Sequence, residues 1–151
     1  MQEFEIIIEC LKGSNEKWEL DEKDGEIKLD FTFTDLYFPF YYGYIPNTRG
    51  GDGDMLDVLL VSSAVYKKGE VVKCRCIGFA EVIDRGEVDN KFVVVPVEDD
   101  KLNDIINIPK TTLKEWESFW QEVAKQKKKI MVIKAWHGKE KALEEIRKSL
   151  G

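Results

Sequence analysis

The hydrophobic pattern of the chain changes its period near Pro109. Before that residue, short apolar runs alternate with polar turns, which is typical of β-strands. Phe4–Cys10 is predicted to be a buried strand, and Lys17–Asp21 and Glu26–Phe33 to form a hairpin around the turn Asp24-Gly25. Further strands are expected at Asp57–Ser63, Glu70–Asp84 and Lys91–Val97, with an aromatic loop at Leu36–Gly51. Short strands at this spacing predict a small closed β-barrel.

After Pro109 the apolar residues recur with a helical period. Thr112 and Glu115 have the spacing of a capping box. The helical face that follows is Leu113, Trp116, Phe119, Trp120 and Val123. Lys129–Trp136 is predicted as a strand and Lys139–Leu150 as a helix, with Ala142, Leu143, Ile146 and Leu150 inward. The fold class expected is α+β, an OB-like closed β-barrel of short antiparallel strands with two helices in the C-terminal third. Residues 1–151 are expected to form one domain.

Composition excludes several functional classes. No apolar run reaches the roughly 18 residues of a membrane span, and the N-terminus lacks the features of a signal peptide. Three cysteines, with Cys74 and Cys76 one residue apart, predict reduced thiols and a cytoplasmic location. A net charge of -6 argues against nucleic acid as a partner. The basic run Lys125–Lys129 is expected to be a solvated helix end, and His137 a surface turn residue.

Acidic residues gather in two segments. Asp52, Asp54 and Asp57 lie within six residues, and Asp84 and Asp89 flank a tight turn. Carboxylates so close together repel one another unless a positive charge lies among them. A solvated loop is one interpretation. The calcium-loop pattern fails, because Ser63 stands where that loop needs a glutamate. Oxygen donors of this kind favour Mg²⁺ or Mn²⁺.

At this point the sequence resembles the soluble family I inorganic pyrophosphatases. The run YYGYIPNTRGGDGDMLDVLL is similar to their signature, and IGFAEVIDRGEVDNKFVVVPV to their second metal segment. KWELDEKDGEIKLD is similar to their N-terminal hairpin. The resemblance covers nearly the whole chain in order, and it implies Mg²⁺-dependent hydrolysis of pyrophosphate to two phosphates. It also implies a homo-oligomer, with a hexamer favoured.

The resemblance assigns roles to individual residues. It implies a site for about three or four Mg²⁺ ions, with Mn²⁺ as a possible substitute. The metal ligands implied are Asp52, Asp57, Asp84, Asp89 and Glu9. Asp54 would be the general base. Lys17, Tyr42 and Lys91 would bind phosphate oxygens, and they count with Asp54 as catalytic residues. Glu19 would lie behind the metal ligands and hold them in position.

The chain departs from the family at three places. No arginine follows Asp30, where the family usually has one that contacts phosphate. The helix pair Tyr-Lys is replaced by Val123 and Ala124, and the proline of the signature by Met55. The part of the site that is expected to bind phosphate therefore has fewer polar and charged side chains than the family pattern. Arg49, Arg85, Lys125 and Lys127 are candidates to compensate.

Two other kinds of function stay open. The aromatic residues of Leu36–Gly51 could be a stacking platform for single-stranded nucleic acid, although packing around the barrel mouth and a subunit contact explain them better. A divergent relative could act on another small phosphoanhydride, or bind metal without catalysis. A substrate panel separates these alternatives from a pyrophosphatase.

Overall fold

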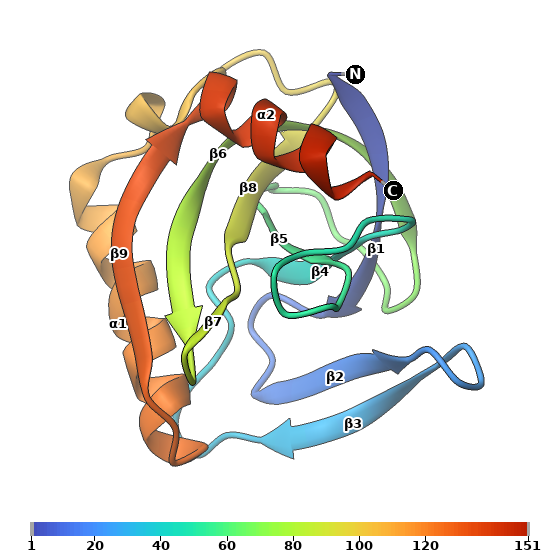
Figure 1. The fold of residues 1–151 in the computed structure, drawn as a ribbon, viewed down its shortest axis with the longest axis vertical. Coiled ribbons are helices and arrows are strands. Elements are labelled where there is room, and N and C mark those ends of the chain that lie inside the picture. The colour runs from blue at the N-terminus through green and yellow to red at the C-terminus, as the bar shows by residue number, and fades with distance from the viewer. Residues whose placement is uncertain (1, 151) are drawn as a thin grey trace.

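The computed structural model describes residues 2–150, and five of its strands close into a barrel (Figure 1). These strands are β1 (Glu3–Cys10), β4 (Tyr41–Ile45), β5 (Leu56–Leu60), β8 (Lys91–Pro96) and β6 (Val71–Asp84). Hydrogen bonding runs in the order β1-β4-β5-β8-β6, and a further pairing of β6 with β1 closes the ring. The predicted fold class is confirmed. One detail differs from it, because β5 and β8 are parallel while the other pairs of the ring are antiparallel.

Alternating side chains of the barrel strands enter two separate apolar clusters. On β5, Val58 and Leu60 belong to one cluster and Leu59 to the other. The first cluster collects residues of all five barrel strands and is closed by Ala142 and Ile146. This is the period of two that strands require when both faces are covered. Strands β4 and β1 approach so closely that a side chain at Gly43 would overlap the carbonyl of Ile7.

The C-terminal third covers the barrel with two helices and a strand. Helix α1 (Lys110–Gln126) follows the short 3₁₀ helix η1 (Ile105–Asn107), β9 (Met131–Gly138) pairs with β6, and α2 (Lys139–Ser149) ends the fold. The predicted capping box at Thr112 is wrong. Helix α1 begins earlier, at Lys110 directly after Pro109, so Thr112 lies within the helix and not at its start. Leu150 was predicted to face inward, but it follows α2 and is partly exposed.

The hairpin of β2 (Glu16–Asp21) and β3 (Glu26–Thr32) forms its own two-stranded sheet. In Figure 1 it extends beneath the barrel, opposite α2. A second small turn carries β7 (Glu87–Val88), which pairs with the end of β6. The hairpin and this turn approach the same end of the barrel, where the acidic segments also lie.

Most aromatic side chains of the segment 36–51 are buried and not exposed to solvent. Tyr41–Ile45 was predicted as loop but forms β4, buried at every position. Of the aromatic residues before it, Phe38 and Phe40 are also buried, and Tyr37 is exposed. A nucleic acid base cannot stack on buried rings, so the platform interpretation loses its basis.

Two smaller predictions have different outcomes. The three cysteines are free and buried, as expected. His137 is not a surface turn residue, because it lies on β9 with its ring against Phe79 and its Nε2 2.8 Å from Glu81. Within residues 2–150, no helix is both long and apolar enough to cross a bilayer.

Candidate active site

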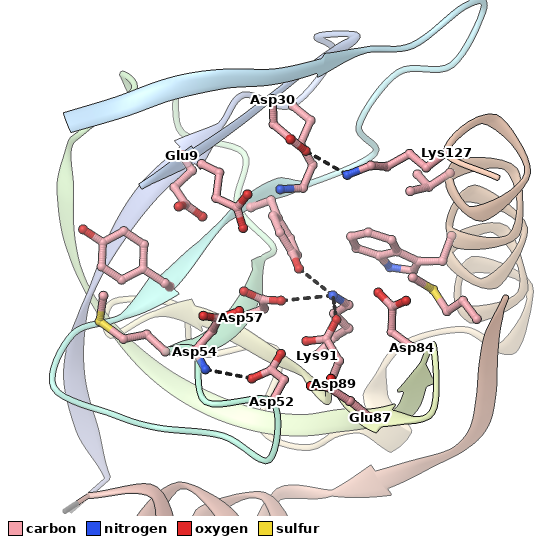
Figure 2. Close-up of a pocket in the computed structure, with 18 of the residues that line it drawn as sticks. Glu9, Asp30, Asp52, Asp54, Asp57, Asp84, Glu87, Asp89, Lys91 and Lys127 are labelled. Atoms are coloured by element: carbon pink, nitrogen blue, oxygen red, sulfur yellow. Dashed lines mark hydrogen bonds and ion pairs between the residues drawn. The ribbon is translucent and has the colours of Figure 1, made fainter. Parts of the chain in front are cut away.

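A pocket of about 630 Å³ opens between the barrel, the β2–β3 hairpin and α1. All ten residues to which the sequence analysis gave a role line it. They are Glu9, Lys17, Glu19, Tyr42, Asp52, Asp54, Asp57, Asp84, Asp89 and Lys91. Figure 2 shows Asp52, Asp54, Asp57 and Asp89 gathered around Lys91, with Glu9 and Asp30 across the pocket. Residues as far apart in sequence as Glu9 and Lys91 are thus brought to one cavity.

The loop between β4 and β5 holds three of the carboxylates. Gly53 has a φ of +85°, a conformation that glycine adopts without strain, and this allows the tight turn. The backbone N–H of Asp54 donates to the Asp52 carboxylate at 3.0 Å. Asp57 follows as the second residue of β5, so its position is set by the barrel. The spacing Asp-x-Asp-x-x-Asp therefore combines a turn with a strand end.

Lys91 is the positive charge among the carboxylates. Its ammonium donates to Asp57 at 3.0 Å, to Asp89 at 2.9 Å and to the Tyr42 hydroxyl at 2.8 Å. Its side chain is only 4% exposed, and its ammonium lies 4.7 Å from the centre of the Trp120 ring. Burial alone would lower the pKa of Lys91, but Asp89 and Asp57 raise it well above its usual value. Lys91 therefore stays charged.

The carboxylates respond to the crowding of the site. Desolvation is the largest cause of the raised pKa values of Asp52, Asp54 and Asp89, and repulsion between carboxylates adds to it. Burial raises the pKa of Glu9 to about 7, although Glu9 accepts a hydrogen bond from the backbone N–H of Leu20 at 2.7 Å. These acids would bind a cation in place of a proton.

The hairpin contributes Lys17, whose ammonium lies 5.9 Å from the ring centre of Tyr42. Burial acts to lower the pKa of Lys17, but Glu19 and other acidic neighbours outweigh it and raise the value. Tyr42 is buried, and desolvation followed by the field of Asp57 raises its pKa well above the usual value. Lysine and tyrosine thus remain hydrogen-bond donors.

The run Lys125–Lys129 was predicted to be a solvated helix end, and this is wrong for two of its residues. Lys127 and Lys129 line the pocket. Lys127 pairs with Asp30 at 2.8 Å, and Lys129 pairs with Asp84 at 2.7 Å. The pairing with Lys129 lowers the pKa of Asp84 in spite of its burial. Lys129 and Asp30 received no role from the sequence, because only folding brings them to the site.

The sequence offered four basic residues that could replace the missing phosphate contacts, and the structure places only two of them at the pocket. Arg85 and Lys127 line the pocket, whereas Arg49 and Lys125 do not. Arg49 pairs instead with Glu22 at 2.8 Å, and Lys125 lies on the exposed side of α1. Val123 does line the pocket, but it offers no polar group there.

The donor set of the pocket fits divalent cations. Ten carboxylates and five basic side chains line it, so acids outnumber bases two to one. Carboxylate oxygens are the ligands that hard cations such as Mg²⁺ prefer. As they stand, no three acidic, histidine or cysteine side chains among residues 2–150 converge on one ion position. Lys91 holds Asp57 and Asp89 instead, so an ion that uses these carboxylates must share them with Lys91.

Comparison with known proteins agrees with this arrangement. The family model of inorganic pyrophosphatase matches residues 6–151. The inorganic pyrophosphatase of Aquifex pyrophilus is 35% identical and matches 99% of this chain and 88% of its own length. That of Geobacillus stearothermophilus is 37% identical over 91% of this chain and 86% of its own.

Solved structures show the same relationship. The inorganic pyrophosphatase of Thermus thermophilus superposes with a TM-score of 0.91 and 32% identity, covering 99% of this chain and 90% of that one. That of Helicobacter pylori gives a TM-score of 0.92 with 29% identity, covering 99% and 92%. The family model and the solved structures cover almost the whole chain, so this chain belongs to the inorganic pyrophosphatase family.

Proposed function

We propose that this protein hydrolyses inorganic pyrophosphate to two phosphates and depends on Mg²⁺ to do so. The observation that carries the proposal is the gathering of all ten motif residues in one pocket, in a chain of this family. In the cell, this hydrolysis would pull forward biosynthetic reactions that release pyrophosphate.

The acidic wall would hold the metal. We assign Asp52, Asp57 and Asp89 to a first ion, and Asp57 would also bind a second. Asp84 and Asp89 would bind a third ion, and Glu9 would contact a fourth through water. Mn²⁺ is the expected substitute. Bound there, divalent ions would cancel part of the charge of the diphosphate and make a water molecule more acidic. Glu19 would support this wall from the hairpin.

Asp54 is suited to accept the proton of the attacking water. It lies on an exposed loop at the edge of the pocket, and desolvation together with Asp52 raises its pKa. A raised pKa makes a carboxylate a better base, which favours proton transfer at neutral pH. The backbone of Asp54 is fixed by its hydrogen bond to Asp52, so the carboxylate is presented from an ordered turn.

Lys17, Lys91 and Tyr42 would hold the phosphoryl oxygens. The Tyr42 oxygen accepts a hydrogen bond from Lys91, and the neighbouring Asp57 carboxylate is a partner for its O–H. When Asp57 binds an ion instead, this O–H would be free to donate to an oxygen of the substrate. Both lysines keep their charge because acidic neighbours raise their pKa values. Donors fixed before the substrate arrives stabilise charge that develops during the reaction.

The test is phosphate release from pyrophosphate with and without Mg²⁺. Turnover should require Mg²⁺, and Asp54→Asn and Asp57→Asn should each lower it by about 10²-fold or more. Asp100→Asn, at an exposed position outside the pocket, is the matched control and should leave turnover unchanged. Absence of turnover with Mg²⁺ still bound would favour another phosphoanhydride substrate or a non-catalytic relative, and a substrate panel would separate these two.

We further propose that the protein is a cytoplasmic homo-oligomer, with a hexamer favoured. The buried free thiols are consistent with a reducing compartment. Ile130 and Val132, at the start of β9, are 78% and 49% exposed, and apolar side chains of this kind are available for a subunit contact. Light scattering coupled to size-exclusion chromatography measures the mass in solution, and a monomer would contradict this proposal.

A further inference from the structure

The α1 side of the pocket presents a lysine that none of the roles above uses. Lys127 stands directly after the last residue of α1, and its side chain returns to the pocket instead of pointing into solvent. The Lys127 side chain is 23% exposed, and its ammonium lies 5.8 Å from the centre of the Phe31 ring. A carboxylate fixes this position, because Asp30 accepts a hydrogen bond from Lys127 at 2.8 Å. Figure 2 shows this contact reaching across from α1 to the hairpin.

Lys127 does not act alone at this end of the pocket. Phe31, whose ring lies beside Lys127, is the cross-strand neighbour of Lys17 in the β2–β3 hairpin. Burial would raise the pKa of Asp30, but the hydrogen bond from Lys127 and the fields of Lys127, Lys17 and Lys129 lower it. Several ammonium groups thus act on one partly exposed carboxylate. Lys129 pairs with the buried Asp84, whereas Lys127 pairs with this partly exposed carboxylate.

A diphosphate needs cationic contacts at both of its phosphoryl groups. Lys91 would serve the phosphoryl group at the acidic wall, where it also donates to Asp57, Asp89 and Tyr42. The helix contributes only Val123 and Trp120 between that wall and Lys127, and Val123 has no polar atom to offer. Residues 120, 123 and 127 share one face of the helix, so Lys127 is the cation that this face brings to the pocket.

We propose that Lys127 binds a phosphoryl oxygen of the substrate, in a subsite that it shares with Lys17. Asp30 then acts as a positioning residue that holds the lysine before the substrate arrives. This inference rests on the proposed function, since it assigns a further contact to the same anionic substrate. It also explains how the chain manages without a basic residue after Asp30.

Two variants that break the same ion pair provide the test. Lys127→Gln removes the cation, whereas Asp30→Asn breaks the pair but keeps the cation. Binding of methylenediphosphonate, a non-hydrolysable diphosphate, is measured by calorimetry in saturating Mg²⁺, alongside kcat and KM for pyrophosphate. Lys127→Gln should weaken analogue binding by about 10- to 100-fold, the usual loss of a charge-assisted hydrogen bond, and raise KM. Asp30→Asn should weaken analogue binding by less than about threefold, because the cation remains and the amide oxygen can still accept its hydrogen bond.

A matched control is present on the same helix. Lys125→Gln removes the same charge from the exposed side of α1 and should change neither binding nor KM by more than about twofold. Urea unfolding of all variants reports any loss of stability. A merely structural ion pair would affect Lys127→Gln and Asp30→Asn equally, and this outcome would overturn the inference.

The result for the wild type separates this inference from the proposed function. If the wild type hydrolyses pyrophosphate and Lys127→Gln binds the analogue normally, the subsite is refuted and the function stands. If the wild type binds the analogue without turnover and Lys127→Gln loses that binding, the function is refuted and the subsite stands. If the wild type neither turns over nor binds, both are refuted.

Discussion

The two walls of the pocket are built in different ways. The acidic wall comes from the β4–β5 loop and the ends of β6 and β8, where Asp52, Asp57 and Asp89 surround Lys91. The helical wall comes from α1 and the residues after it, where Lys127 and Lys129 each meet a single carboxylate. Barrel strands fix the first wall, whereas a helix end and its following turn fix the second.

The difference shows which part of such a site tolerates change. A carboxylate in the acidic wall shares its partners, so replacing one residue alters the charge balance of the rest. A lysine at a helix end needs only a side chain long enough to enter the pocket and one carboxylate to orient it. A lysine at another position can therefore take its place. The departures that remove polar or charged phosphate contacts accordingly lie outside the acidic wall, at Phe31, Val123 and Ala124. Met55 lies within that wall, but it replaces a proline and changes no charge.

The largest effect is expected from Lys91→Met, which breaks the acidic wall. Its removal leaves Asp57 and Asp89 close together without their shared cation. The free energy of unfolding in EDTA should fall by about 3 kcal/mol, the lower end for a buried ion pair because both carboxylates are partly exposed. Turnover should fall by about 100-fold or more, because a phosphate contact is lost as well.

Added Mg²⁺ sharpens this prediction. Divalent ions give Asp57 and Asp89 another positive partner, so Mg²⁺ should recover part of the stability that Lys91→Met loses. Urea unfolding in EDTA and in Mg²⁺ measures this, with Lys148→Met at an exposed ion pair as the control. A loss that Mg²⁺ leaves unchanged would show that these carboxylates do not bind the ion.

An effect of intermediate size is expected from the pH dependence of Glu9. Its pKa is raised from 4.5 to about 7, so the folded protein binds a proton that the unfolded chain releases. Between these values the metal-free protein should lose stability as pH rises, by on the order of 3 kcal/mol in total. Asp52, Asp54 and Asp89 act in the same direction and Asp84 in the opposite one.

Glu9→Gln isolates this contribution. The amide oxygen can still accept from Leu20, but it does not titrate, so the variant should be more stable than the wild type at pH 8 in EDTA. Glu5→Gln, on the same strand but exposed, should follow the wild-type curve. Chemical unfolding from pH 5 to pH 8 measures the three proteins. If Glu9→Gln and the wild type lose stability in parallel, Glu9 is not the group responsible.

The same comparison explains how much the sequence could predict. The strands, the hairpin and the acidic wall follow from local signals, because a turn and the strand after it fix Asp52, Asp54 and Asp57. β4 was missed because its alternation is hidden by aromatic residues buried on both faces. Lys127 was only one of four basic candidates that the sequence could not place, and Lys129 was missed because a basic run after a helix is usually solvated. Only the turn that brings β9 beside β6 places Lys129 against Asp84.

The smallest effect is expected from Arg85→Gln, at the rim of the pocket. Arg85 and Lys129 both contact Asp84, but the side chain of Arg85 is 71% exposed and that of Lys129 is 12% exposed. Water and salt screen a charge that is so exposed, so kcat/KM should change by less than about threefold near 0.15 M salt. Lys129→Gln should lower kcat/KM further, because the buried Asp84 would keep only the exposed Arg85 as its partner. Steady-state kinetics at low and high salt measure both variants, and equal losses would show that burial does not separate the two cations.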